Sequence, residues 1–208
     1  MENLTSQSRR FFLGSAGALV VSFALPIPGM AAEKGAAAGA WPTKIAPEML
    51  DSWLAVLPDG SVVAAVGKIE AGMGVSTSFI QMIADELDVP MDRVTMNMGD
   101  TATTVDQRGT GSSNGIMQGG SALRKAGAEA RQALLAMAAQ RFNVKPEQLT
   151  VTDGVVSVVG DPGRSVTYGD LIGGKRFDLT MTGKAKTKPA SQYKLVGKSI
   201  PRVDIPPK

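Results

Sequence analysis

The 208-residue chain has the composition of one ordinary globular domain with tails, since 43% of its residues are hydrophobic and 20% are charged. It contains no cysteine and no histidine. This excludes disulfides, an iron–sulfur cluster on this chain, a serine–histidine–aspartate triad and a histidine-bound zinc site. The net charge is only +3 and the basic residues are scattered, so we expect no nucleic-acid partner.

The N-terminal residues 1–32 carry an export signature. Arg9 and Arg10 form a twin-arginine pair ahead of an apolar run at 14–27. We expect a signal peptide that sends the chain to the periplasm by the twin-arginine route. The alternative is an uncleaved membrane anchor, although the apolar run is short for a membrane span. Residues 33–49 are rich in Ala, Gly and Pro and are expected to form a linker.

The folded part is expected to begin near Leu50 with two strands, at 52–57 and 61–66. Asp59 and Gly60 between them have the chemistry of a tight hairpin turn. Neither strand alternates cleanly between apolar and polar residues. Both are therefore expected to be buried on two faces.

Helical spacing follows at 75–87, where apolar residues recur on one face and Ser76 or Thr77 can cap the start. The alternating stretch 93–98 predicts a further strand. Residues 115–142 are rich in Ala and Leu and predict the longest helix, with Arg124, Arg131 and its other charged residues on the solvent side.

A second hairpin is predicted from 150–152 and 155–159, and a strand leading into a short helix at 165–172. The fold class is therefore α/β (α+β), with a mixed sheet, β-hairpins and packed helices over residues 50–183. Residues 184–208 are polar, basic and proline-bearing, and are expected to form an extended linker toward a further domain.

The first stretch that could bind a ligand is the turn containing Gly72, Met73 and Gly74, between a strand and a helix. Its glycines allow close backbone approach, and the free N–H groups of the first helical turn favour an anion such as pyrophosphate. The spacing lacks a third glycine and the P-loop lysine. The alternative is an ordinary strand-to-helix turn with no ligand.

A second loop of the same kind precedes the long helix. Its glycines and hydroxyl side chains suit a polar or anionic ligand, and it includes Thr110, Gly111, Ser112 and Ser113. The alternative is a simple capping region, with Ser113 or Asn114 as the cap. Two such loops on either side of one strand could grip the two ends of one extended polyanionic cofactor.

The carboxylates near these loops are Glu70, Asp100 and Asp106. A general-base role is open to them in principle, but Asp100 in a Gly-Asp-Thr sequence is typical of a turn. We assign no catalytic residue and no metal ligand to this chain.

Several separated motifs in this order resemble the xanthine dehydrogenase/aldehyde oxidase family. More closely, they are similar to its molybdopterin-binding subunits of the isoquinoline 1-oxidoreductase (beta chain) and nicotinate or aldehyde dehydrogenase type. The motifs lie at 67–77, 84–90, 99–101 and 109–113, and the tail at 194–208 resembles the family's linker into its next domain. The resemblance covers residues 53–208 and corresponds to the N-terminal portion of such proteins.

The resemblance implies a molybdenum hydroxylase, which inserts a water-derived oxygen into an aldehyde or an N-heteroaromatic substrate. The implied cofactor is molybdopterin, as its cytosine dinucleotide, with molybdenum held by the pterin dithiolene, so the lack of His and Cys is no objection. The motif match assigns cofactor binding to residues of both glycine loops, namely Gly72, Met73, Gly74, Thr110, Gly111, Ser112 and Ser113.

Two departures from the family pattern matter. Met73 stands where many relatives have Gln, so a side-chain hydrogen bond to the cofactor would be lost. Family members are also several times longer, and their base-acting glutamate lies near the far C-terminus. We therefore expect no turnover by this chain alone.

The implied partners are the remaining molybdopterin-binding polypeptide, a 2Fe–2S subunit that takes the electrons and, as a further candidate, a cytochrome c. One alternative is a truncated, non-catalytic remnant or interaction module with no cofactor. Another is an unrelated exported nucleotide-binding module.

Overall fold

The computed structural model describes Pro42 and residues 44–205. The twin-arginine pair Arg9 and Arg10, the predicted signal peptide and most of the predicted linker at 33–49 lie outside the described residues. In the described part of the chain, no helix combines the length and apolar character that a membrane span requires.

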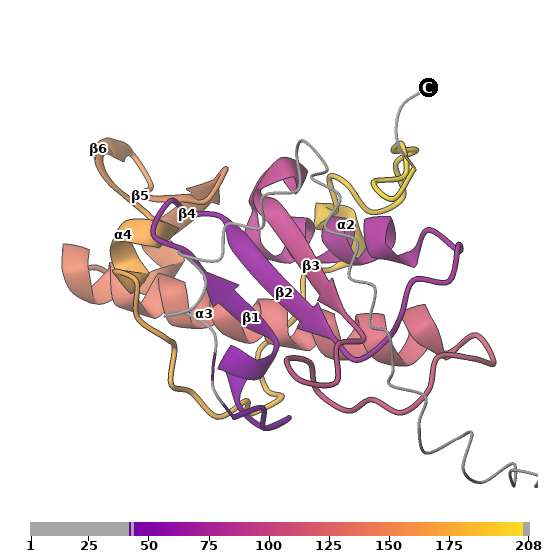
Figure 1. The fold of residues 1–208 in the computed structure, drawn as a ribbon. Coiled ribbons are helices and arrows are strands. Elements are labelled where there is room, and N and C mark those ends of the chain that lie inside the picture. The colour runs from indigo at the N-terminus through magenta and orange to yellow at the C-terminus, as the bar shows by residue number, and fades with distance from the viewer. Residues whose placement is uncertain (1–41, 43, 206–208) are drawn as a thin grey trace, which may run out of the picture. The chain divides into compact units, whose positions relative to one another are not determined.

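The central element is a three-stranded mixed sheet (Figure 1). Strand β1 (Leu54–Val56) pairs antiparallel with β2 (Val62–Val66), and β2 pairs parallel with β3 (Val94–Met98). Nearly every residue of β1 and β2 is buried, which confirms that these strands are covered on both faces. Strand β1 begins at Leu54 and not at the predicted residue 52, because Leu50–Ser52 forms a 3-10 helix.

Helix α2 (Val75–Leu87) is the crossover between the parallel strands β2 and β3, and its bounds match the prediction. Its apolar face is buried at Phe79, Ile83 and Leu87. Asp88 ends the helix in the left-handed conformation, and its N–H donates to the carbonyl of Ala84. A 3-10 helix, Met91–Arg93, then leads into β3.

The long helix α3 (Ser121–Phe142) lies behind the first sheet and packs against α2 (Figure 1). The prediction of one continuous helix from residue 115 was wrong, because Gly115–Gly120 forms a π-helix and α3 begins only at Ser121. The crowding there is severe. A Cβ added at Gly119 would lie 2.8 Å from Cγ of Lys68, and one at Gly120 would lie 2.9 Å from Sδ of Met82. Only glycine permits this close approach.

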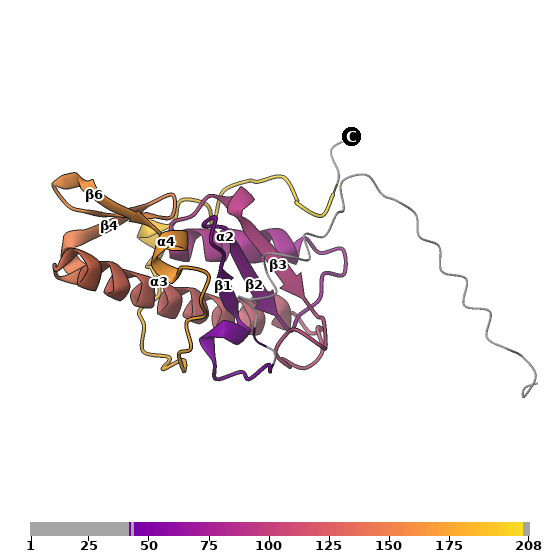
Figure 2. The ribbon, with the colours of Figure 1, turned by 60° about the vertical axis from the view of Figure 1, so that its left-hand side comes forward.

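The second sheet lies at the C-terminal end of α3, as Figure 2 shows. After the 3-10 helix Pro146–Gln148, strands β4 (Leu149–Thr152), β5 (Val155–Val158) and β6 (Asp161–Thr167) form an antiparallel meander. The short helix α4 (Tyr168–Ile172) follows and packs on α3. The buried Tyr168 hydroxyl donates to the carbonyl of Leu87, 3.0 Å away, which ties α4 to the end of α2.

The segment after residue 184, which was predicted to be an extended linker, is packed against α2 over its described part. It contains one 3-10 helix, Ala190–Gln192, and runs along α2 from the C-terminal to the N-terminal end of that helix. Backbone groups of Lys194 and Leu195 bond to Asp85, and the N–H of Val203 donates to Thr77 Oγ1. The last described residues therefore return to the first glycine turn.

Candidate functional site

The two glycine loops meet around one pocket of about 430 Å³. One side comes from the turn before α2 and the other from the loop and π-helix before α3. The lining residues are Ala71, Met73, Val75, Ser78, Thr110, Gly111, Ser113, Asn114, Gly115 and Ile116. Two segments about forty residues apart in the sequence thus line a single pocket. That one extended ligand spans both loops stays a prediction.

The structure brings four of the predicted cofactor residues into this pocket: Met73, Thr110, Gly111 and Ser113. Gly72 and Gly74 lie beside it in the same turn, both with positive φ. Ser112 is next to the lining residues but is not one of them.

The start of α2 is capped by a side chain that the sequence did not suggest. The carboxylate of Glu70 accepts from the N–H of Gly74 and from the N–H of Ser76, both at 2.9 Å. The prediction that Ser76 or Thr77 caps α2 was wrong, because the N-cap residue is Gly74, which has no side chain that could form a cap bond. Burial acts to raise the pKa of Glu70, but these N–H donors outweigh it and hold the pKa below its ordinary value.

This cap bears on the anion prediction for the first loop, which stays a prediction. A carboxylate of the chain already binds the N–H groups of Gly74 and Ser76, two of the donors at this helix end. A phosphate at this helix end would have to displace Glu70. The polar contacts offered to a ligand therefore come chiefly from the second loop.

The two loops are joined to each other just after β2. Gly67 N–H donates to Gln107 Oε1 at 3.0 Å, and Ile69 N–H donates to Thr110 Oγ1 at 3.0 Å. Between them, the fully buried Lys68 ammonium donates to the carbonyls of Gln107 at 2.8 Å and of Gly109 at 3.1 Å. These hydrogen bonds hold the second loop against the first.

Asn114 organises the second loop from within. Its Oδ1 accepts from Gly111 N–H at 3.1 Å, and its Nδ2 donates to the carbonyl of Gly109 at 3.0 Å. Ser112 and Ser113 both adopt positive φ, which non-glycine residues seldom do. The loop is therefore a defined turn, in which neither Ser113 nor Asn114 caps the helix through its side chain.

The other two carboxylates near the loops have local roles. Asp100 accepts from the N–H of Ala102 and the hydroxyl of Thr103, at 2.9 and 2.6 Å, and these bonds lower its pKa. Asp106 accepts from the N–H of Arg108 at 2.8 Å. Both are turn-forming carboxylates, as the sequence suggested for Asp100.

Arg202 braces the first glycine turn beside the pocket, which the sequence did not reveal. Its Nη1 donates to the carbonyl of Gly72 at 3.0 Å, and its side chain packs against Gly74. Asp204 pairs with the same guanidinium. No local pattern marks Arg202, because its place depends on the return of the chain along α2.

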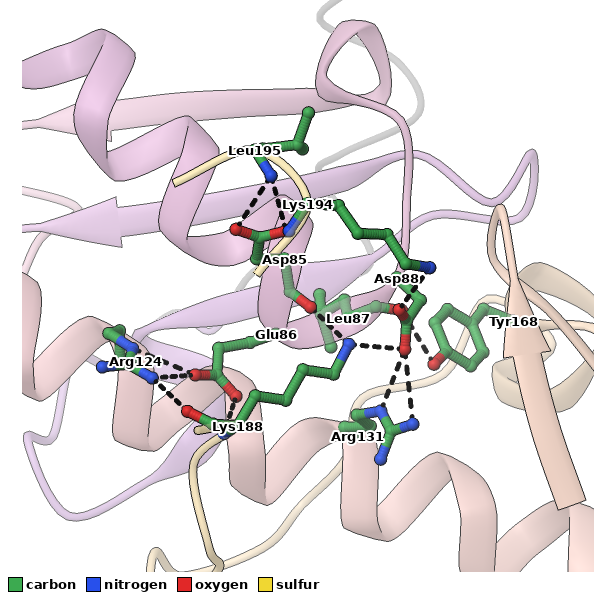
Figure 3. Close-up of polar contacts among 10 residues, drawn as sticks. All are labelled: Asp85, Glu86, Leu87, Asp88, Arg124, Arg131, Tyr168, Lys188, Lys194 and Leu195. Atoms are coloured by element: carbon green, nitrogen blue, oxygen red, sulfur yellow. Dashed lines mark hydrogen bonds and ion pairs between the residues drawn. The ribbon is translucent and has the colours of Figure 1, made fainter. Parts of the chain in front are cut away.

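The opposite end of α2 carries three acidic side chains, all drawn in Figure 3, and none of them is left without partners. Asp85 accepts three consecutive backbone N–H groups, those of Lys194, Leu195 and Val196, at 2.9, 3.1 and 2.7 Å. These three hydrogen bonds fix the path of the tail along α2.

The other two carboxylates pair with cations from α3 and the tail. Glu86 binds Arg124 through two nitrogens at 3.0 and 2.7 Å, and Asp88 pairs with Arg131 and Lys188 at 3.3 and 2.6 Å. The prediction that Arg124 and Arg131 face solvent was therefore wrong. Burial lowers the pKa of Lys188 against the opposing effect of Asp88.

The pocket combines an apolar wall with a polar edge. Ala71, Met73, Val75 and Ile116 supply an apolar wall. The second loop supplies hydroxyl and backbone groups, and a Cβ at Gly111 would meet nothing within 4 Å. In the described part of the chain, no group of three or more acidic, His or Cys side chains could hold a metal. An apolar wall beside hydroxyl and backbone groups fits a heterocyclic cofactor such as a pterin.

Comparison with known proteins agrees with this chemistry. A family model described as a molybdopterin cofactor-binding domain matches residues 29–205. One chain of the nicotinate dehydrogenase of Pseudomonas putida is 40% identical over 75% of this chain and 13% of its own length. The beta chain of isoquinoline 1-oxidoreductase of Brevundimonas diminuta is 31% identical over 97% of this chain and 30% of its own length.

Solved structures give the same result. Quinoline 2-oxidoreductase from Pseudomonas putida 86 superposes on 58% of this chain and 15% of its own, with a TM-score of 0.51 and 26% identity. CO dehydrogenase from Oligotropha carboxidovorans covers 57% of this chain and 15% of its own, with a TM-score of 0.52 and 29% identity. The chain spans less than a third of the length of each of these relatives. It belongs to the molybdopterin cofactor-binding domain family, within the molybdopterin-binding subunits of the xanthine dehydrogenase/aldehyde oxidase type.

Proposed function

We propose that this chain supplies part of the molybdopterin site of a molybdenum hydroxylase. Such an enzyme hydroxylates an aldehyde or an N-heteroaromatic substrate with oxygen derived from water. The observation that carries the proposal is the single pocket between the two glycine loops, with Met73 on one side and Thr110, Gly111 and Ser113 on the other. The names of the relatives, which include nicotinate and isoquinoline enzymes, support the N-heteroaromatic class.

The chain's own residues would bind and orient the cofactor. The second loop offers hydroxyl and amide groups to its polar edge, while the apolar wall around Met73 excludes water from one face. The cofactor would supply the molybdenum and the redox chemistry. None of the carboxylates near the pocket is free to act as a base, since Glu70 caps α2 and Asp100 and Asp106 hold turns.

The wider assembly belongs to the same proposal. We place the iron–sulfur cluster on a separate 2Fe–2S subunit and the rest of the molybdenum site on another polypeptide segment, with a cytochrome c as a further candidate. Several relatives are named as one chain of a larger enzyme, which supports partner chains in general. We further propose that the cofactor is the cytosine dinucleotide form. We also propose that the chain is exported to the periplasm by the twin-arginine route.

The test is to isolate the protein from its native host under mild conditions, then to measure molybdenum per chain and identify co-purifying chains by mass spectrometry. The informative variant is Gly111→Leu. Gly111 lines the pocket, and a Cβ added there would meet no atom within 4 Å, so the leucine side chain is expected to project into the pocket. Gly163→Leu is the matched control, because Gly163 is exposed in β6 and far from the pocket lining.

We expect stoichiometric molybdenum and a large partner chain with the wild type and with Gly163→Leu. Gly111→Leu should fold normally and lose the metal. Wild-type protein without molybdenum and without partners would overturn the proposal in favour of a non-catalytic remnant. Full metal content in Gly111→Leu would show that the cofactor binds elsewhere.

A further inference from the structure

Lys68 is the one fully buried lysine among the described residues, and its role is not explained by packing alone. Its exposed fraction is 0%. No carboxylate within the described chain lies within ion-pair distance of its ammonium, whose acceptors are the carbonyls of Gln107 and Gly109. Burial of a cation without an opposite charge is costly. An apolar side chain of similar length would avoid that cost.

The two acceptors of Lys68 belong to the second glycine loop. The Gly109 carbonyl is held from two directions, by Lys68 Nζ at 3.1 Å and by Asn114 Nδ2 at 3.0 Å. A trans peptide unit is planar, and its carbonyl and its N–H point in opposite directions. Fixing the Gly109 carbonyl toward Lys68 therefore turns the N–H of Thr110 away from it.

Thr110 is a lining residue of the pocket. Its hydroxyl oxygen accepts from the N–H of Ile69 at 3.0 Å. Its backbone N–H has no acceptor among the hydrogen bonds of the described residues. The orientation that Lys68 imposes thus leaves a free donor at the edge of the pocket, next to a buried positive charge that polarises the same peptide.

We propose that Lys68 is a positioning residue, which fixes the Gly109–Thr110 peptide so that the Thr110 N–H is presented to an acceptor atom of the bound pterin cofactor. The inference rests on the proposed function and deepens it. Lys68 does not touch the ligand. It acts through the peptide that it holds, and its charge strengthens the donor toward an electron-rich acceptor.

A purely structural role makes a different prediction. The Lys68 stem packs beside Gly119, and Gly119 lies against Phe79. If filling this space were the only purpose, any change at Lys68 would lower stability and loop order together. If positioning is the purpose, a neutral isostere should keep or raise stability, because it removes an uncompensated buried charge, and should still weaken the hold on the cofactor.

The experiment compares Lys68→Met with wild type, with Lys175→Met as control. Lys175 is exposed, and the one hydrogen bond it donates comes from its backbone. The readouts are urea unfolding, amide hydrogen exchange by NMR and molybdenum retained during dialysis of protein isolated from the native host. We expect Lys68→Met to unfold at equal or higher urea, to exchange the Ile69 and Gly111 amides about tenfold faster and to lose molybdenum about tenfold faster.

Two results would overturn the positioning role. One is metal retention in Lys68→Met equal to that of a molybdenum-loaded wild type. The other is a stability loss that accounts for the metal loss, since that is the signature of simple packing. A wild type that carries no molybdenum overturns the proposed function instead, and removes the ligand that the Thr110 N–H would meet.

Discussion

The two ends of α2 are built in opposite ways. At the C-terminal end, Asp85 and Glu86 are buried and Asp88 is partly buried, and their partners come from α3 and the tail (Figure 3). At the N-terminal end, one carboxylate caps the helix and the glycine turn beyond it opens onto a pocket. There the side chain of Met73, which lines the pocket, is 58% exposed.

The two ends of α2 differ in what their polar groups do. At one end they hold the fold together, and at the other they face a pocket. Polar groups that serve the fold are mutually satisfied, because an unpaired buried polar group is costly. Donors and apolar side chains left exposed around a concave site are the ones available to a ligand. We call the C-terminal end of α2 the closed end, because its carboxylates are paired within the chain, and the N-terminal end the open end, because its glycine turn borders the pocket between the loops.

The largest expected effect is at the closed end. Glu86→Ala would leave Arg124 and the N–H of Lys188 without their buried carboxylate. We expect a loss of about 3 to 5 kcal/mol in unfolding free energy, as for other broken buried ion pairs. Urea denaturation measures it, with exposed Glu147→Ala as control. A loss equal to that of the control would contradict the view that this end is the anchor.

Asp85→Asn comes next. The amide keeps the shape but weakens acceptance of three backbone N–H groups, including those of Lys194 and Val196. A loss of about 2 kcal/mol is expected. Amide exchange should rise at 194–203 without a change in β2, and exposed Asp92→Asn serves as control. An unaltered tail would show that other contacts hold it.

At the open end, Gly67→Ala tests the junction of the loops. A Cβ there would lie 2.0 Å from the carbonyl oxygen of Val105, so the backbone must shift. We expect a loss of about 1 to 3 kcal/mol. Gly109→Ala is the matched control, because its Cβ would meet open space. Equal thermal stability of the two variants would refute the close contact.

The smallest effect is expected at Glu70. Glu70→Ala removes the cap of α2 and should cost about 1 kcal/mol at neutral pH. The folded-state pKa of Glu70 lies below its ordinary value of 4.5, so its contribution is present above pH 4.5 and is lost as the pH falls through the folded-state pKa. Unfolding of variant and wild type measured from pH 7 to 3 should converge. A constant difference would mean that the carboxylate charge is irrelevant.

Much of the fold could be predicted from sequence because its signals are local. The bounds of α2 and the strand 94–98 follow from periodicity and from the stop at Asp88 and Pro90. The π-helix could not be predicted, since it depends on Lys68 and Met82 lying against Gly119 and Gly120.

Only the local part of the candidate site could be predicted from the sequence. Glycine spacing marked both loops, but the Glu70 cap, the Lys68 anchor and the approach of Arg202 depend on contacts between segments. Arg124 and Arg131 were placed on the wrong side because their partners, Glu86 and Asp88, lie on another helix or at its end. Charge patterns within one helix cannot reveal such partners.

The central claim is that the cofactor binds at the open end of α2 and leaves the closed end unchanged. The most direct measurement is amide hydrogen exchange of the protein isolated from its native host, before and after the molybdenum cofactor is removed. We predict that removal increases exchange at 71–75 and 109–116 and changes nothing at 188–196. Increased exchange at 188–196, or none at the two glycine loops, would contradict the account.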